Sequence, residues 1–350
     1  MNKSRAITPV ERAVNHFVLE TETEEAVRAS YVPNTLRTRI SQLRSVERFA
    51  QEKGFAWSVL GNEPLPEKAL ELMLNEIFRN GGSLKTIDAR VDAVRWWSEE
   101  NNLPSPTTHP KLVRARKGWG LKRAKENQAG KNKIEVAHAI GKDVLLEVVS
   151  KIPDTLKGKR DKAIILLGWC GAFRRSELAG LSVENVEAFE NTESGLVGIT
   201  CQVFNTKTKK DGSVDKIIQR MGNPKLCPVR AYYAWLEASK VTTGNVFRSV
   251  TKGGEVGERL SCHSVNAIVK KYFPEDVFGG NTEGQPEVQQ RKRKKITAHS
   301  LRAGYATASV LDKIPPSEAR AQGGWSATSG IFDSYATRAK VGLVARVPTW

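Results

Sequence analysis

One stretch of the chain has the alternating pattern of β-strands, and the patterns on both sides of it are helical. This stretch, 194–221, reads SGLVGITCQVFNTKTKKDGSVDKIIQRM, and its Asp211-Gly212 pair predicts a tight turn between two strands. Helical periodicity dominates the rest of the chain. The sequence therefore predicts a mainly α-helical protein with a small antiparallel β-sheet in its C-terminal domain.

Three helices are predicted in the first third of the chain from their start and stop signals. The first runs from Pro33 to about Lys53 and ends at Gly54. The second covers about 66–79, and the third, capped by Ser83, covers about 84–101. On the first helix Arg37, Ser41, Arg44 and Arg48 share a face away from the apolar stripe. Such a face is usually only solvated, but the charge of the chain favours a position along a phosphate backbone.

A basic segment in the middle of the chain sets the domain boundaries. Residues 111–133 contain nine basic residues and one acid, and their second half is polar. We interpret them as a helix to about Lys125 followed by a linker, and a disordered basic tether is the alternative. The predicted organisation is a helical N-terminal domain at 1–125, a linker at 126–139, and a C-terminal domain with its tail at 140–350.

Positive charge is the strongest signal in the composition. The 350 residues include 55 lysines and arginines against 38 acidic residues, which gives a net charge of +17. This balance favours a polyanionic partner, most commonly nucleic acid, and a generally basic protein without such a partner is the alternative.

Other sequence signals bear on the compartment and on cofactors. The four cysteines are widely spaced and form no C-x-x-C pair, which argues against a zinc ribbon or disulfide framework and fits a reducing cytoplasm. The N-terminus lacks the apolar segment of a signal peptide, and no apolar run approaches the ~18 residues of a membrane span. No carboxylate cluster has metal-ligand spacing. We expect a cytoplasmic protein without membrane association, metal or cofactor.

Several charged residues of the C-terminal domain have a chemical rationale. Arg174 follows a buried-looking apolar helix, and Glu177 stands three residues further on. The glutamate could simply neutralise the arginine, because a buried charge without a partner is costly, or it could aim the guanidinium at a substrate oxyanion. His299 and Arg302 are three residues apart, which places them on the same face of a helical turn.

These residues together could act on a phosphodiester substrate. Its transition state spreads negative charge over two non-bridging oxygens, which the guanidinium groups of Arg174 and Arg302 can bind bidentately in place of a metal ion. Tyr335 offers a hydroxyl nucleophile, which needs a base or a cationic field for activation. Lys207 in the predicted hairpin could protonate the departing oxygen, although such a lysine is most often only solvated.

The order and context of these residues resemble the tyrosine recombinase (phage integrase) family. The matching segments are, in order, GAFRRSELAGL, NTKTKKDG, HSLRAG, GGW and Tyr335, and together they cover about 140–340. Each segment is weak alone, and the ordered set is strong. The N-terminal segments YVPNTLRTRISQLRSVERFAQEKGFAW and KTIDARVDAVRWW resemble Cre-like members of the family and extend the resemblance over most of the chain.

The resemblance implies how the phosphate would be held. Arg174 and Arg302 would clamp the scissile phosphate, and Glu177 would orient the first of them. His299 would accept a proton or donate a hydrogen bond. Trp325 stands where most of the family has a second histidine; its indole N–H can donate to the phosphate but cannot carry a proton.

The resemblance also implies the nucleophile and the acid. Tyr335 would attack and become a 3′-phosphotyrosine. Lys207 would be the general acid, with Lys209 or Lys210 in its place if the hairpin register differs. The spacing before Tyr335 is one residue longer than usual in the family, and Tyr305 is its only rival, although a core position suits Tyr305 better.

The activity implied is site-specific DNA recombination by strand cleavage and rejoining, without metal or ATP. Two domains would form a C-shaped clamp on double-stranded DNA with a specific target site, and a homotetramer in the nucleoid would act on two duplexes. Two alternatives stay open: a non-catalytic DNA-binding protein on the same scaffold, and relaxation of the type IB topoisomerase kind. The candidate DNA contacts are Arg37, Arg44, Lys85, Arg116, Lys122, Arg123 and His263.

Overall fold

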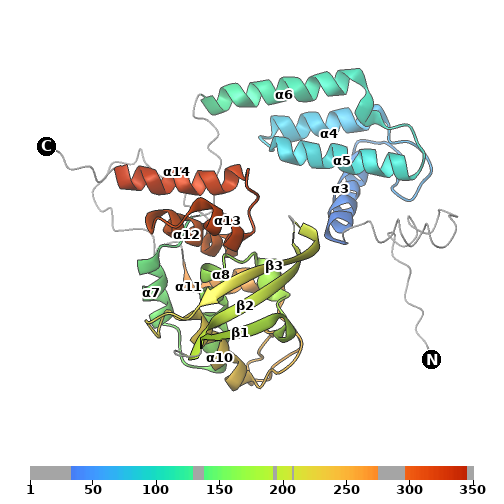
Figure 1. Ribbon diagram of the computed structural model, residues 1–350. Helices are drawn as coiled ribbons and strands as arrows, with labels where there is room; N and C mark the ends of the chain where they lie inside the picture. The colour runs from blue at the N-terminus through green and yellow to red at the C-terminus, as the bar shows by residue number, and fades with distance from the viewer. Residues whose placement is uncertain (1–32, 129–137, 192–194, 207–208, 275–295, 345–350) are drawn as a thin grey trace, which may run out of the picture. The chain divides into compact units, whose positions relative to one another are not determined.

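The computed structural model describes residues 33–128, 138–191, 195–206, 209–274 and 296–344 (Figure 1). The chain divides into two compact units, Met1–Ile134 and Glu135–Trp350. Both are mainly helical where they are described, and the second also contains one small antiparallel sheet. The predicted fold class is therefore confirmed.

The first unit contains the three helices that the sequence predicts, and a fourth follows them. Ser83 caps the third helix, since its hydroxyl accepts a hydrogen bond from the amide of Thr86 at 3.1 Å. Apolar side chains of these helices pack into one core, in which the ring of Trp57 meets that of Trp97 edge-on at 5.0 Å. The helices are α3 (Pro33–Glu52), α4 (Glu67–Arg79), α5 (Leu84–Glu100) and α6 (Pro110–Gln128).

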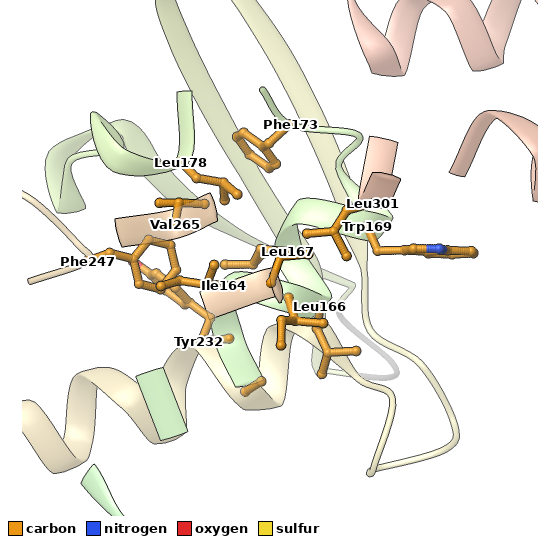
Figure 2. Packing of buried hydrophobic residues seen from close by; sticks show 14 of the residues in the cluster. Ile164, Leu166, Leu167, Trp169, Phe173, Leu178, Tyr232, Phe247, Val265 and Leu301 are labelled. Carbon is orange, nitrogen blue, oxygen red and sulfur yellow. The ribbon is translucent and has the colours of Figure 1, made fainter. Parts of the chain in front are cut away.

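The second unit is built around helix α8 (Leu156–Cys170), whose segment 163–169 is fully buried. Figure 2 shows Ile164, Leu166 and Leu167 of this helix surrounded by side chains from its neighbours. An apolar helix without a polar face must be covered on all sides, and this position explains its sequence. The other helices are α7 (Lys142–Ser150), α9 (Arg175–Ala179), α10 (Pro228–Ser239), α11 (Cys262–Tyr272), α12 (Ala298–Leu311), α13 (Pro316–Gly323) and α14 (Gly330–Val344).

The sheet has the order β1-β2-β3, with all neighbours antiparallel (Figure 1). Its strands are β1 (Val186–Asn191), β2 (Gly195–Thr206) and β3 (Lys209–Gln219). The predicted position of the hairpin turn is wrong, because Asp211-Gly212 lies inside β3. Thr206 pairs with Lys209 and Phe204 with Ser213, so β3 carries extra residues at a bulge. Gly212 has a φ of 144° there, a conformation that glycine adopts readily, so the Asp-Gly pair marks the bulge.

Among the described helices, none is both long and apolar enough to cross a membrane.

Candidate active site

Arg174 sits at a sharp turn between α8 and α9. Gly171 caps α8, and Ala172 adopts the left-handed region with a φ of 47°, an uncommon conformation for a residue with a side chain. Glu177, in the first turn of α9, accepts hydrogen bonds from the backbone amide of Arg174 at 2.8 Å and from its Nη1 at 2.5 Å. Glu177 therefore caps the helix and pairs with the guanidinium of Arg174, which is the first of the two roles that the sequence left open.

Arg302 is buried on α12, with only 1% of its surface exposed. Its Nη1 donates to the carbonyl of Ala172 at 2.6 Å and also to the carbonyl of Gly323. The guanidinium lies over the ring of Trp325, 3.8 Å from the centroid. Burial, followed by the nearby charge of Arg174, lowers the pKa of Arg302 to about 9, so it stays cationic at neutral pH.

The carbonyl groups at the ends of α8 and α13 form a cradle for three cations. We define the carbonyl cradle as the backbone carbonyls of residues 171, 172, 322, 323 and 324. Arg302 binds those of 172 and 323, the Nη2 of Arg174 donates to that of 324 at 3.2 Å, and Lys216 binds those of 171 and 322. The last carbonyls of a helix lack intrahelical partners and carry the negative end of its dipole, which explains why cations gather at these two helix ends.

Lys216 is the member of this cluster that the sequence interpretation missed. It lies on β3, is 1% exposed, and its Nζ is 3.9 Å from an oxygen of Glu177. Burial lowers the pKa of Lys216 to about 7, with Glu177 opposing the shift and Arg302 and Arg174 adding to it. The signal that could have found it is strand alternation, since Lys216 is two residues from the buried Ile218 and shares its face of the sheet.

Tyr335 and His299 are joined directly. Tyr335 lies on α14, is 2% exposed, and packs with small buried side chains of α12 and α13. Its hydroxyl is 2.9 Å from Nε2 of His299, at the start of α12. Partial burial of the imidazole, followed by the charges of Arg302 and Arg174, lowers the pKa of His299 below 6.5. A neutral imidazole with its proton on Nδ1 can therefore accept the proton of the Tyr335 hydroxyl at neutral pH.

The Gly-Gly pair before Trp325 has a steric explanation. A Cβ on Gly323 would lie 1.8 Å from Cζ3 of Trp325, and Gly324 has a φ of 63°. Together they let the indole fold back beside α13, where it stacks on Arg302 and lies 5.3 Å from the ring of Phe332. The structure thus places Trp325 against Arg302, in a stacking contact that the sequence did not predict.

Arg320 holds the segment between Trp325 and Tyr335, where the spacing departs from the family. Its Nη1 donates to the carbonyl of Ala327 at 2.6 Å, and its Nη2 pairs with Asp333 at 2.5 Å. The segment is therefore tied at both ends to α13. Sequence interpretation did not single out Arg320.

Two further candidates for the chemistry have different outcomes. Lys207 lies outside the described residues, and the side chains of Lys209 and Lys210 at the start of β3 do too. Tyr305 packs edge-on against Trp169 at 6.3 Å, and burial raises its pKa. A raised pKa makes its hydroxyl a poorer nucleophile, which agrees with a core position.

The candidate DNA contacts fall into two groups. Arg37, Arg44, Lys85 and Lys122 are exposed in the first unit, and His263 is exposed at the start of α11 in the second. These five side chains are placed to meet solvent or a ligand, and the ammonium of Lys122 also lies 5.6 Å from the centroid of the Phe78 ring.

Arg116 and Arg123 instead have protein partners. Arg116 pairs with Asp88 at 2.6 Å. Arg123 binds Glu126 at 2.9 Å and the carbonyls of Phe78 and Gly82 at 3.3 and 3.2 Å. These bonds join α6 to the end of α4, so Arg123 has a structural role that the count of basic residues could not reveal.

Within the described part of the chain, no group of histidine, cysteine and carboxylate side chains is arranged to hold a metal ion.

Comparisons with known proteins show which proteins the chain is similar to. No family model matches the chain. A curated relative, the integrase/recombinase xerD homolog of Selenomonas ruminantium, is 32% identical over 185 residues, which are 49% of this chain and 47% of the relative. The chain therefore matches about half the length of that protein.

Solved structures share the fold at lower identity. XerH site-specific recombinase bound to palindromic difH substrate has a TM-score of 0.56 at 15% identity, covering 96% of this chain and 86% of its own. A lambda integrase (75–356) dimer bound to a COC′ core site has a TM-score of 0.51 at 16% identity, covering 90% and 93%. The chain resembles tyrosine recombinases in sequence and in fold, as predicted; the closer likeness to Cre stays a prediction.

Proposed function

We propose that this chain is a tyrosine site-specific recombinase, which cleaves and rejoins double-stranded DNA through a 3′-phosphotyrosine intermediate. One observation carries the proposal: the Tyr335 hydroxyl lies 2.9 Å from Nε2 of His299, three residues before Arg302, and the guanidinium groups of Arg302 and Arg174 bind the adjacent carbonyls of residues 323 and 324. A nucleophile, its proton acceptor and two guanidinium groups thus occupy one site. The curated relative, itself described as an integrase/recombinase, supports the same class.

The cleavage step follows from these positions. The Tyr335 oxygen attacks phosphorus while its proton passes to Nε2 of His299, and a bond to the 3′ phosphate forms. The bond to the 5′ oxygen breaks, and that oxygen takes a proton, which we assign to Lys207. Arg174 and Arg302 balance the charge on the non-bridging oxygens. The reverse reaction on another 5′-hydroxyl reseals the strand, and no ATP is consumed because one phosphate ester replaces another.

Access of a DNA phosphate to this site requires part of the chain to move, because its key side chains are buried. Arg302 and Tyr335 are 1% and 2% exposed, and Trp325 covers one face of the Arg302 guanidinium. Nη1 of Arg302 is already used by two carbonyls, so its Nε and Nη2 are the donors for a phosphate. We expect DNA binding to move α14 or Trp325 before the phosphate reaches these donors, as catalytic contacts often form only in the complex.

The wider features of the proposal follow from charge and stoichiometry. A net charge of +17 is expected to give affinity for DNA that falls steeply as salt rises. Each copy of the chain offers one Tyr335, so exchange of all strands between two duplexes would take four copies. A homotetramer on two duplexes, acting in the nucleoid, is therefore part of the proposal.

A covalent adduct tests this function. A target duplex would first be selected by binding from a random-sequence library, and then synthesised with a nick that lets the 5′ end diffuse away after cleavage. Wild type should form a protein–DNA adduct that survives denaturation, and Tyr305→Phe should form it too. Tyr335→Phe should form none. Absence of the adduct with wild type, or its persistence in Tyr335→Phe, would contradict the proposal.

A further inference from the structure

Lys216 is a buried lysine that the chemistry above leaves without a role. Its Nζ donates to the carbonyls of Gly171 at 2.9 Å and Gln322 at 2.8 Å, and lies 4.9 Å from the centroid of the Phe173 ring. Taking an ammonium out of water is costly unless it is paired. The two carbonyls and the Glu177 carboxylate at 3.9 Å supply that pairing, and they all belong to the candidate site.

Each carbonyl bound by Lys216 is adjacent in sequence to one bound by Arg302. Gly171 precedes Ala172, and Gln322 precedes Gly323, whose carbonyls both accept from Nη1 of Arg302. The next carbonyl, that of residue 324, accepts from Arg174. Because neighbouring peptide planes are covalently coupled, fixing residues 171 and 322 also limits how the rest of the carbonyl cradle can turn.

The same contacts connect the cradle to the β2–β3 hairpin. The side chain of Gln322 accepts from the amide of Ile217 at 3.2 Å and donates to its carbonyl at 2.8 Å. Ile217 follows Lys216 on β3. The end of α13 is therefore bound to that strand by the two hydrogen bonds of the Gln322 side chain and by the bond from Lys216 to the carbonyl of Gln322. Residues 207–208, where the proposed acid Lys207 lies, connect β2 to β3.

We propose that Lys216 is a positioning residue that holds the carbonyl cradle of the arginine pair and links it to the β2–β3 hairpin. The inference rests on the proposed function, which assigns those arginines to the phosphate. It predicts that loss of the Lys216 donors disturbs the geometry of cleavage more than it disturbs DNA binding.

Lys216→Met is the test variant, because methionine has a similar volume and no donor. The substitution leaves the carbonyls of Gly171 and Gln322 without this donor and therefore costs stability, so circular dichroism and the melting temperature first establish that the variant is folded under the assay conditions. Lys252→Met, at an exposed lysine, is the matched control. At saturating DNA the adduct should form about 10- to 100-fold more slowly in Lys216→Met, the size expected when reacting groups are misplaced. The DNA affinity should stay within about threefold of wild type.

A double-mutant cycle with Arg302→Lys separates positioning from a general packing role. If Lys216 acts through Arg302, the double variant should be little slower than Arg302→Lys alone. Multiplying losses, or a cleavage rate of Lys216→Met equal to wild type, would overturn the inference. A fall in DNA affinity that matches the fall in rate would do the same.

Hydrogen exchange decides the point even if the proposed function fails. Should wild type form no adduct, that result counts against the recombinase and says nothing of the cradle. The amides of residues 321–338 should exchange faster in Lys216→Met than in wild type or Lys252→Met. Equal exchange in all three proteins would show that Lys216 does not hold this segment.

Discussion

Gly323→Ala tests the packing of Trp325 against Arg302 in a way that can be worked out from distances. The new Cβ would lie 1.8 Å from Cζ3 and 2.0 Å from Cε3 of Trp325. Carbon atoms in contact need about 3.5–4 Å, so the indole would have to move by roughly 2 Å. It cannot do so while it lies 3.8 Å from the Arg302 guanidinium and 5.3 Å from the Phe332 ring.

The cost of this displacement has two parts. Overpacking of a buried site costs about 1–3 kcal/mol, and a lost cation–π contact costs about 0.5–2 kcal/mol. Together they predict a loss of about 1.5–5 kcal/mol in the free energy of unfolding of the second unit. With an m-value of about 2 kcal/mol/M, the urea midpoint of that unit should fall by about 0.8–2.5 M.

The assay is equilibrium urea unfolding followed by circular dichroism and tryptophan fluorescence, with Gly330→Ala as the control. A Cβ on Gly330, at the start of α14, meets nothing within 4 Å, so its substitution should change the stability by less than about 0.5 kcal/mol. If Gly323→Ala unfolds at the same urea concentration as Gly330→Ala, Trp325 is not packed as the structure has it.

Four further predictions concern single side chains. Trp325→Phe keeps a ring on Arg302 and should lose less cleavage rate than Trp325→Ala; equal losses would show that the indole N–H, and not the stacking, matters. The cleavage rate should fall on the acid side only below pH 6.5, because the lowered pKa of His299 keeps the imidazole neutral and able to accept a proton at higher pH. A fall that already begins above pH 6.5 would show that another group than His299 causes it. The second unit should become more stable from pH 7 to about pH 8.5, below the pKa of Arg302, because unfolded Lys216 binds a proton that the folded protein has released above about 7. This rise should vanish in Lys216→Met, and a rise of the same size in that variant would refute the assignment. Arg44→Ala should weaken DNA binding and reduce the salt dependence of binding, with an unchanged melting temperature. Arg123→Ala should instead lower the melting temperature of the first unit, because it removes the bonds to the carbonyls of Phe78 and Gly82. The reverse pattern would contradict both assignments.

Elements with strong local signals were predictable from the sequence. The helix capped by Ser83 and the helix that starts at Pro33 begin where the sequence places them, because capping and proline preferences act within one turn. The role of the Asp211-Gly212 pair could not be predicted from local signals in the same way. The pair suits a bulge as well as a hairpin reversal, and only the pairing of β2 with β3 decides between them.

The residues of the candidate site could be predicted where their side-chain type alone suggests a role with a phosphate. Arg174, Arg302 and Tyr335 stand out by residue type and order. Lys216 did not, because its partners at residues 171 and 322 are 45 and 106 positions away in the sequence. A lysine in a strand is normally solvated, and only the tertiary fold supplies the carbonyls that make its burial favourable.

The identity of the attacking residue is the most direct test of the account. The adduct formed on the nicked target duplex would be digested with trypsin and with nuclease, and the peptides analysed by mass spectrometry. Cleavage after Arg320 and Arg338 yields the peptide 321–338, AQGGWSATSGIFDSYATR, which contains Tyr335. The account predicts a nucleotide attached to Tyr335 in this peptide. A nucleotide on any other residue, Tyr305 included, would contradict it.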